Sequence, residues 1–445
     1  MRGTHVAVGA GWVLLATELL GAGYIAAATP PARSSVPFVA TRHDTVRDLL
    51  WLAGVEKNDV VYDLGSGDGR IVLAAVRDFG ARRAVGIESD PDRVLESRES
   101  AQKAGLTGRV EFIQGDLFMT DFSPASVVTL FLGHQPNIEL RPKILSMLKP
   151  GTRVLSHQFG MGEWAIDKEL TVRMTTPGMW AEMWNPYQDN PCVPDYSANE
   201  MHFGTSDKVL MWVVPSPVAG VWTGVVETPD GQRDYRLILH QRLSEVSGTF
   251  QLSGVTPLTG GIRAELWGDH VRYEGIPSGI PYGRFQIRFD GHASGDSMKG
   301  TLAIADPNRS YEVTWEGQRD KVSLTGQWEW TSATGDRPVR LRVERRDSRS
   351  VATYLDRDKQ IPVPDFYDFG GGFYFTLLIG REGSSLTIKE DTGWLIGEGV
   401  IDQGELKGRM DFYPYPSTGL PRGLDGKRTI RPEVHQDWTP RRIKP

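Results

Sequence analysis

The chain has 445 residues, of which 39% are hydrophobic and 24% charged, and a formal net charge of −6. A chain of this length holds two or three domains, and its acidic balance argues against a nucleic-acid binder, which normally carries a basic excess. The single cysteine, Cys192, excludes an intrachain disulfide and a zinc site built from several cysteines.

Residues 6–28 are mostly apolar, follow Arg2 and end in small residues before Pro30. A basic start, an apolar middle and a small-residue end are typical of a secretory signal. We therefore expect residues 1–35 to be a signal peptide or membrane anchor plus a linker, in an exported or membrane-anchored protein that contacts a membrane through residues 6–28. Glu18 is costly inside a bilayer, so a cytoplasmic protein with a soluble N-terminal helix stays open as the alternative.

A helix is predicted to begin near Thr41, because Asp44 three residues later would complete a capping box. An apolar stripe at Val46, Leu49 and Leu50 supports this helix.

The next segment has the pattern of a buried strand, a tight turn and a helix. Val60-Val61-Tyr62 leads into Asp63, glycines follow at alternate positions, and an apolar helical run begins at Ile71. A nicotinamide fingerprint would need a third glycine where Arg70 stands. The spacing Asp-x-Gly-x-Gly-x-Gly instead resembles the cofactor loop of class I S-adenosylmethionine-dependent methyltransferases.

Strands and helices then alternate as far as residue 158, which predicts a mainly parallel sheet covered on both faces. The second strand ends in Glu88, where an acid is placed to bind both ribose hydroxyls of a nucleotide cofactor. The third strand, residues 110–114, leads into Asp116, which the resemblance places on the adenine amino group. Two more strands, near residues 170–174 and 208–214, complete a seven-stranded Rossmann-like fold.

The resemblance implies S-adenosyl-L-methionine as the cofactor. The predicted cofactor-binding residues are Asp63, Gly65, Ser66, Gly67, Asp68, Gly69, Glu88, Asp116 and Leu117. We expect no metal, because no ligand cluster stands out and the sulfonium is already an activated methyl donor. We predict no catalytic residue, because such an enzyme mainly aligns donor and acceptor.

Within this class, residues 36–215 resemble bacterial relatives of the mitochondrial protein-lysine N-methyltransferases. The similarity lies in Val36-Pro37-Phe38-Val39-Ala40-Thr41, in Gly162-Glu163-Trp164 and, between them, in the segments Val128–Leu132, Leu140–Lys143 and Leu148–Val154. The Pro-Pro-Tyr motif of adenine and glutamine methyltransferases is absent after the fourth strand, where Gly133-His134-Gln135-Pro136 stands. The resemblance thus implies N-methylation of an accessible lysine on a protein partner.

A long insertion from about residue 176 to 205 separates the last two strands of this domain. Its side chains Trp180, Trp184 and Tyr187 present aromatic faces that can hold an ammonium by cation–π contact. We predict that they contact the substrate. An aromatic patch that packs on the next domain is the alternative.

Beyond residue 215 helical periodicity disappears and short alternating runs take over. Gly220-Val221-Trp222 recurs as Gly326-Gln327-Trp328, and Gly295–Gly300 recurs in shortened form as Gly404–Gly408. This repeat predicts two tandem antiparallel barrels or sandwiches, residues 216–320 and 321–445, which resemble lipocalin-like modules loosely.

The predicted protein is therefore a methyltransferase domain, residues 36–215, followed by a β-rich binding appendage. Two alternatives remain open at this point. One is an exported or envelope binding protein that keeps the fold without turnover, and the other is a methyltransferase of small molecules.

Overall fold

The structure is a computed structural model, and it describes residues 38–173, 206–254, 257–280, 285–331, 338–346, 349–356, 359–380, 392–414, 434–438 and 441–443. In this part of the chain no helix has the length and apolar character needed to span a bilayer.

The first part of the described chain is built on one seven-stranded sheet in the order β3-β2-β1-β4-β5-β7-β6. The strands are β1 (Val60–Leu64), β2 (Arg83–Glu88), β3 (Val110–Gln114), β4 (Val127–Leu130), β5 (Arg153–His157), β6 (Lys168–Arg173) and β7 (Ser206–Val213). Strands β1 to β5 run parallel, whereas β7 is antiparallel to β5 and β6. The expected Rossmann-like sheet is confirmed.

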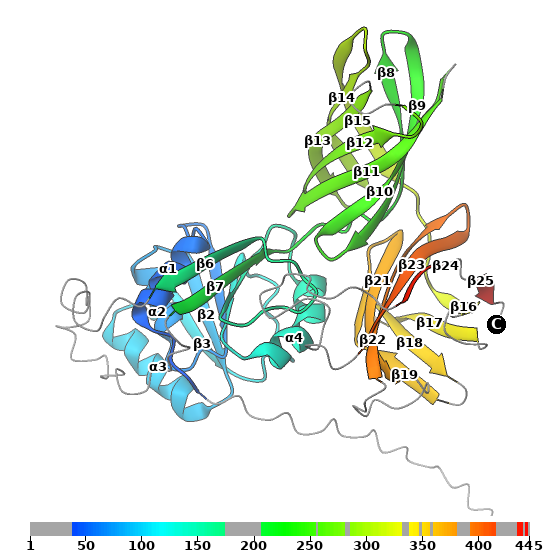
Figure 1. The fold of residues 1–445 in the computed structure, drawn as a ribbon. Coiled ribbons are helices and arrows are strands. Elements are labelled where there is room, and N and C mark those ends of the chain that lie inside the picture. Colours follow the sequence, from blue (N-terminus) through cyan, green and yellow to red (C-terminus); the bar gives the residue numbers. More distant parts are fainter. Residues whose placement is uncertain are drawn as a thin grey trace, which may run out of the picture. The chain divides into compact units, whose positions relative to one another are not determined.

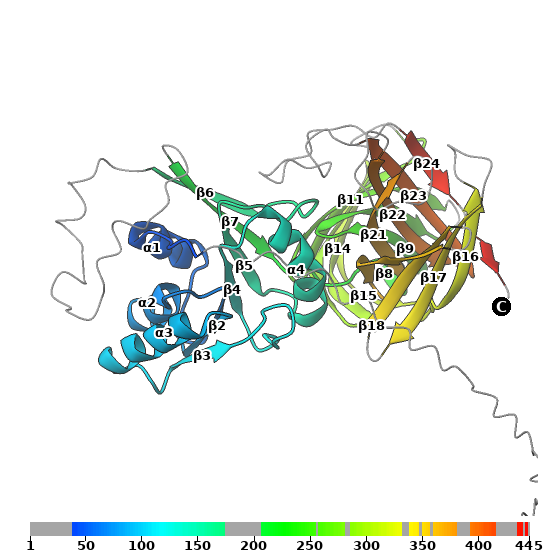
Figure 2. The same cartoon turned by 90° about the horizontal axis from the view of Figure 1, so that it is seen from below.

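Helices cover both faces of this sheet (Figures 1 and 2). They are α1 (His43–Leu52), α2 (Arg70–Arg77), α3 (Pro91–Lys103) and α4 (His134–Met147). The first three helices bury apolar side chains in one core with Val61, Leu155 and Val209, and α4 shares the other core with Leu64, Val154 and Trp212. Side chains alternate between the faces of a strand, so a sheet with two covered faces needs apolar residues at successive positions.

Two helix boundaries differ from the sequence expectation. The prediction of a capping box at the start of α1 is wrong. Thr41 lies outside the helix, and the N-cap residue is Arg42, which makes no side-chain cap hydrogen bond. Asp44 instead accepts hydrogen bonds from Arg42 and Thr45. The sequence predicts a helix from about Glu139 to Leu148, but helix α4 begins five residues earlier, at His134, and keeps Pro142 in its interior.

The second part of the described chain contains a closed eight-stranded barrel. Its strands are β8 (Gly220–Thr228), β9 (Gly231–Arg242), β10 (Glu245–Leu252), β11 (Leu258–Trp267), β12 (His270–Pro277), β13 (Gln286–Ser294), β14 (Ser297–Ala305) and β15 (Ser310–Arg319). Buried aromatic rings fill the barrel interior, and several of them pack directly against glycines of the strands. A Cβ atom on Gly317 would lie 2.3 Å from Trp315, and one on Gly260 would lie 2.6 Å from Phe250.

Two five-stranded antiparallel sheets follow, in the orders β19-β18-β17-β16-β25 and β20-β21-β22-β23-β24. Their strands are β16 (Gly326–Thr331), β17 (Pro338–Arg346), β18 (Arg349–Asp356), β19 (Lys359–Val363), β20 (Asp365–Asp368), β21 (Gly372–Gly380), β22 (Thr392–Asp402), β23 (Glu405–Pro414), β24 (Val434–Trp438) and β25 (Arg441–Ile443). Trp328 and Leu341 of the first sheet share a core with Phe375 and Met410 of the second, so the two sheets pack as a sandwich.

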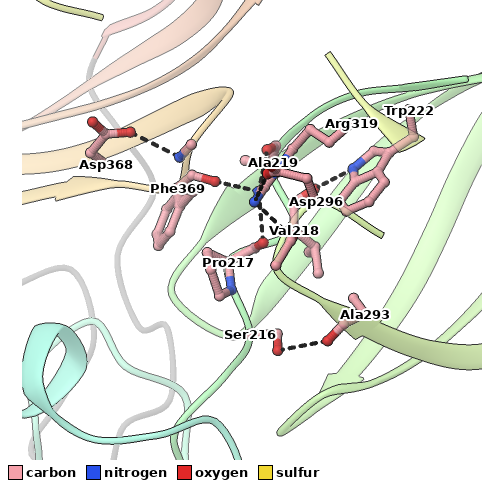
Figure 3. Close-up of polar contacts among 12 residues, drawn as sticks. Ser216, Pro217, Val218, Ala219, Trp222, Ala293, Asp296, Arg319, Asp368 and Phe369 are labelled. Carbon is pink, nitrogen blue, oxygen red and sulfur yellow. Dashed lines mark hydrogen bonds and ion pairs between the residues drawn. The ribbon is translucent and has the colours of Figure 1, made fainter. Parts of the chain in front are cut away.

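A buried arginine closes the barrel where its last strand meets its first (Figure 3). The guanidinium of Arg319 lies 5.1 Å from the ring centroid of Trp222, and its Nη1 donates to the carbonyls of Pro217 and Phe369. The indole N–H of Trp222 donates to the carbonyl of Val218 at 2.8 Å. In the second β unit Arg442 lies 5.3 Å from the Trp328 ring, and the Trp328 indole donates to the carbonyl of Leu324 at 2.8 Å. The repeated tryptophan therefore makes the same contacts in both units.

Candidate cofactor and acceptor site

The turn between β1 and α2 takes a backbone path that only glycine follows without strain. Gly65 has φ 83° and Gly67 has φ 52°. A Cβ atom on Gly67 would lie 2.2 Å from the ring of Phe38, and one on Gly65 would lie 2.6 Å from Leu132. The two glycines therefore let side chains from the N-terminal segment and from the end of β4 close over the turn.

Glu88, at the end of β2, is held by backbone N–H groups. Its Oε1 accepts from the N–H of Ser89 at 2.7 Å and of Asp90 at 2.9 Å, and its Oε2 accepts from the N–H of Gly67 at 2.9 Å. A carboxylate has about four acceptor positions, and Oε2 takes only one of these bonds. The carboxylate is thus fixed beside the glycine turn with acceptor capacity left, which fits the ribose contact predicted for it.

Asp63 ends the β1 pattern as a fully buried carboxyl group. The hydroxyl of Thr129 donates to its Oδ1 at 2.6 Å. Burial raises the pKa of Asp63 to about 7, and the charges of Asp68 and Glu88 add to this rise. A nearby positive charge would favour the ionised form of such a carboxyl, so the residue fits a cationic ligand.

The carboxylate of Asp68 is engaged by Arg70, a residue that the sequence did not single out. Both oxygens of Asp68 accept from Arg70, with Nη2 at 2.7 Å from Oδ2. Arg70 also donates through Nη1 to the carbonyl of Thr41 at 2.6 Å. This buried pair ties the glycine turn to the segment that precedes α1. Ser66, between the glycines, is buried, and its hydroxyl lies against Gly86 of β2.

Asp116 and Leu117 follow β3, next to the strand that carries Glu88. The Oδ1 of Asp116 accepts from the N–H of Phe118 at 2.8 Å, and the carbonyl of Leu117 accepts from Lys143 at 3.0 Å. Asp63, Glu88 and Asp116 thus stand at the carboxyl ends of three adjacent parallel strands, the edge where sheets of this kind bind ligands.

The predicted substrate residues Trp180, Trp184 and Tyr187 lie outside the described residues. The sequence missed a buried cluster around His157, which ends β5. Its Nε2 lies 3.4 Å from the carboxylate of Asp207, its Nδ1 lies 3.4 Å from the hydroxyl of Thr41, and Thr45 donates to Asp207 at 3.0 Å. Burial raises the pKa of Asp207, but the hydrogen bond and charge of His157, together with Thr45 and Arg42, bring it below its usual range.

The cluster was hard to predict, because Asp207 follows His157 by fifty positions and reaches it only through the antiparallel pairing of β7 with β5. His134, the other histidine near this edge, begins α4, and burial lowers its pKa. In the described ranges no group of acidic, histidine or cysteine side chains could hold a metal ion.

Comparisons with known proteins agree with this geometry. The family model described as the ANTKMT methyltransferase domain matches residues 63–168. A protein-lysine N-methyltransferase of Saccharolobus islandicus (strain REY15A) is 46% identical over 129 residues, which are 29% of this chain and 80% of that protein. An adenine nucleotide translocase lysine N-methyltransferase of Mus musculus is 36% identical over 134 residues, which are 30% of this chain and 58% of that protein.

A solved structure, titled as an RNA methyltransferase from Salinibacter ruber in complex with S-adenosyl-L-homocysteine, is 42% identical. It covers 40% of this chain and 94% of its own, with a TM-score of 0.31. S-Adenosylmethionine is the cofactor of the methyltransferase domain that the family model matches, and the glycine turn with its fixed carboxylates fits it. Because 80% of a 46% identical relative is covered, the chain belongs to the protein-lysine N-methyltransferase family, among the class I S-adenosylmethionine-dependent methyltransferases.

Proposed function

We propose that this enzyme N-methylates a lysine side chain of a protein partner. The observation that carries the proposal is the 46% identity over four fifths of a protein-lysine N-methyltransferase. Two sequence features support it. No Pro-Pro-Tyr motif for a planar amide or base follows β4, and the net charge of −6 favours a partner with positive charge over nucleic acid.

We assign the cofactor's parts to the carboxylates that end β1, β2 and β3. Glu88 would accept from the ribose hydroxyls, because backbone N–H groups already fix both of its oxygens. Asp116 would accept from the adenine amino group. Asp63 would face the cationic amino-acid end, where a positive charge stabilises its ionised form. The glycine turn lets the backbone approach the ligand closely.

When bound, S-adenosylmethionine supplies a methyl group on a sulfonium, which needs no further activation. The protein's task is therefore to align the acceptor and to remove water from it. A neutral acceptor amine would form the new N–C bond as the S–C bond of the bound cofactor breaks, and the positive charge would pass to the methylated ammonium. Desolvation at the site lowers the pKa of a lysine and so favours the neutral amine.

We further propose that the β-rich half, residues 216–445, is a binding appendage, and that residues 6–28 direct the protein to a membrane or out of the cell. The apolar run in residues 6–28 supports the second part. Cell fractionation of the full chain, with and without residues 1–35, tests it. Full-length protein found only in the soluble cytoplasmic fraction would contradict it.

Transfer of labelled methyl groups to a lysate of the protein's own source tests the acceptor. We expect label on protein, located by mass spectrometry on lysine. With cofactor held below its Kd, Glu88→Gln should sharply reduce labelling, whereas Glu99→Gln, which removes an exposed acid of α3, should not. Label confined to RNA, to small metabolites or to residues other than lysine would overturn the proposal.

A further inference from the structure

The end of β5 contains a strained turn that the chemistry described so far does not require. Gln158 has φ 69°, and the N–H of Phe159 donates to the carbonyl of His157 at 2.8 Å. This is a γ-turn with a positive φ at its central residue, which is rare and strained for any residue but glycine. Such strain persists only where the surroundings fix it, and it concentrates at functional sites.

Neighbouring groups fix this turn from both sides. Gln158 exchanges two hydrogen bonds with Lys208 of β7, through its N–H at 2.7 Å and its Oε1 at 3.0 Å. From α4, the buried amide of Asn137 donates to the carbonyl of Phe159 and to the hydroxyl of Ser156, each at 3.0 Å. Hydrogen bonds to the backbone of Gln158 and Phe159 therefore fix the position of Phe159.

The turn brings two phenyl rings together at the edge of the sheet. The Phe131 ring, directly after β4, lies 5.9 Å from the Phe159 ring at 25° and 4.1 Å from the His157 ring at 37°. Both phenyl rings are half-buried, whereas His157 is buried against Asp207 and Thr41. The buried His157 ring is thus in direct contact with the Phe131 ring.

These rings lie next to the cofactor turn. Leu132, which follows Phe131, packs on Gly65 of that turn. Thr129 of β4, two residues before Phe131, donates a hydrogen bond to Asp63. The Phe131 and Phe159 pair is therefore within one strand of the groups assigned to the cofactor, on the side of β5.

We propose that Phe131 and Phe159 bind the alkylammonium side chain of the acceptor, and that His157 is a positioning residue for Phe131. The inference rests on the proposed function, because a lysine is the acceptor that such a pair suits. The ring faces attract an ammonium or methylammonium by cation–π contact, and the same rings exclude water along the aliphatic stem. Asp207, behind His157, adds negative charge at this end of the sheet.

The test uses the full chain labelled with 4-fluorophenylalanine, in the presence of S-adenosylhomocysteine. The fluorine resonances of residues 131 and 159 are assigned from Phe131→Leu and Phe159→Leu. Titration with n-butylammonium should shift both resonances saturably, and neutral n-butanol should not. Each Leu variant should weaken butylammonium binding by about 2- to 30-fold, while Phe79→Leu, a half-buried ring after α2 at the opposite end of the sheet, should not.

Unmoved resonances at 131 and 159, or variants that bind butylammonium as the wild type does, would overturn the proposal. A kinetic arm tests the lysine directly. Phe159→Leu and His157→Asn should raise the KM for labelled lysate protein by several-fold, with the calorimetric Kd of S-adenosylmethionine within about twofold. An unchanged KM in both variants also overturns the proposal. A wild type that labels no lysine defeats the proposed function instead, and the butylammonium titration still decides the inference.

Discussion

Glu88 serves two groups at once, because it accepts from the N–H of Gly67 and is assigned to the ribose. We expect Glu88→Gln to weaken S-adenosylmethionine binding about 10- to 150-fold, since a hydrogen bond to a charged group contributes about 1.5–3 kcal/mol. Isothermal titration calorimetry measures this, with Glu99→Gln, at an exposed acid of α3, as the matched control. A Kd that stays within twofold of the wild type would remove Glu88 from the cofactor site.

Asp63 makes the ligand-free protein sensitive to pH. Its pKa is raised by burial to about 7 in the folded protein, against an ordinary value of 3.8. The folded state therefore binds the proton more tightly than the unfolded chain does, and this stabilisation is complete below pH 4 and lost as the pH rises through 7. We predict that Asp63→Asn flattens the decline in Tm between pH 4 and pH 8.

The same experiment needs a control for Asp167, a second carboxyl group that titrates in this pH range, because burial raises its pKa to about 6. Asp167→Asn should flatten the lower part of the same curve, and the double variant should flatten more than either. The assignment to Asp63 fails if Asp63→Asn leaves the slope between pH 6 and pH 8 unchanged.

Sequence reasoning at the residue scale reached the three strand-end acids and did not reach His157 or Arg70. The acids follow a fixed order in one βα series, so their spacing is visible along the chain. His157 meets Asp207 only after β7 pairs with β5, and Arg70 meets Thr41 only after α1 docks. Neither contact leaves a local pattern in the sequence.

At the scale of elements, the segment before α1 is positioned by its neighbours rather than by its own cap. Its carbonyl at Thr41 accepts from Arg70, its Thr41 hydroxyl meets His157, and Phe38 lies over Gly67 with Arg93 at 4.0 Å from the ring. Apolar periodicity predicted the helix correctly. The capping box failed because the Thr41 hydroxyl lies next to His157, and the Asp44 carboxylate binds its sequence neighbours Arg42 and Thr45.

The Arg70–Asp68 pair gives this element a direct test. Arg70→Met leaves a buried carboxylate without its partner and frees the Thr41 carbonyl, so we expect a loss of about 3–5 kcal/mol in the free energy of unfolding. Arg77→Met is the matched control on the same helix, where a half-exposed pair with Asp78 contributes at most about 1 kcal/mol. Urea denaturation measures both, and equal losses would contradict the role given to Arg70.

At the scale of the whole molecule, α4 and β20 share a buried ion pair. Arg141 donates to Asp365, to the hydroxyl of Tyr367 at 3.2 Å and to the carbonyl of Met161 at 2.8 Å. We expect Asp365→Ala to lower the free energy of unfolding by about 3–5 kcal/mol, because it leaves a fully buried guanidinium unpaired. Asp230→Ala, at a fully exposed pair with Arg309, should leave the free energy of unfolding nearly unchanged, because solvent screens that pair.

A second variant separates the charge from the packing in that prediction. Arg141→Met combined with Asp365→Leu removes both partners, and replacement of a buried pair by apolar side chains is often neutral. The double variant should therefore be more stable than Asp365→Ala alone. If it is less stable, the contact depends on shape and not on the charge pair.

The β-rich half was predicted as two tandem barrels or sandwiches, and the structure contains one closed barrel and one sandwich of two sheets. Alternating runs and turn residues indicate strands, and the repeated Gly-x-Trp motif indicates a repeat. Closure was not predictable, because it depends on whether the last strand pairs with the first. Both units pair their last strand with their first, β15 with β8 and β25 with β16. In the described part of the second unit, however, β19 does not pair with β20 and β24 does not pair with β25, so its strands form two sheets.

The matching Trp222–Arg319 and Trp328–Arg442 contacts support the predicted duplication. They also mean that, during folding, the final strand of one copy can pair with the initial strand of either copy. Each final strand carries an arginine that suits either of two initial strands, roughly one hundred residues apart. Tandem copies of one module are prone to such exchanged pairing during folding. Refolding from denaturant should therefore divide between a correctly paired population and a slower one in which strands of the two copies have been exchanged.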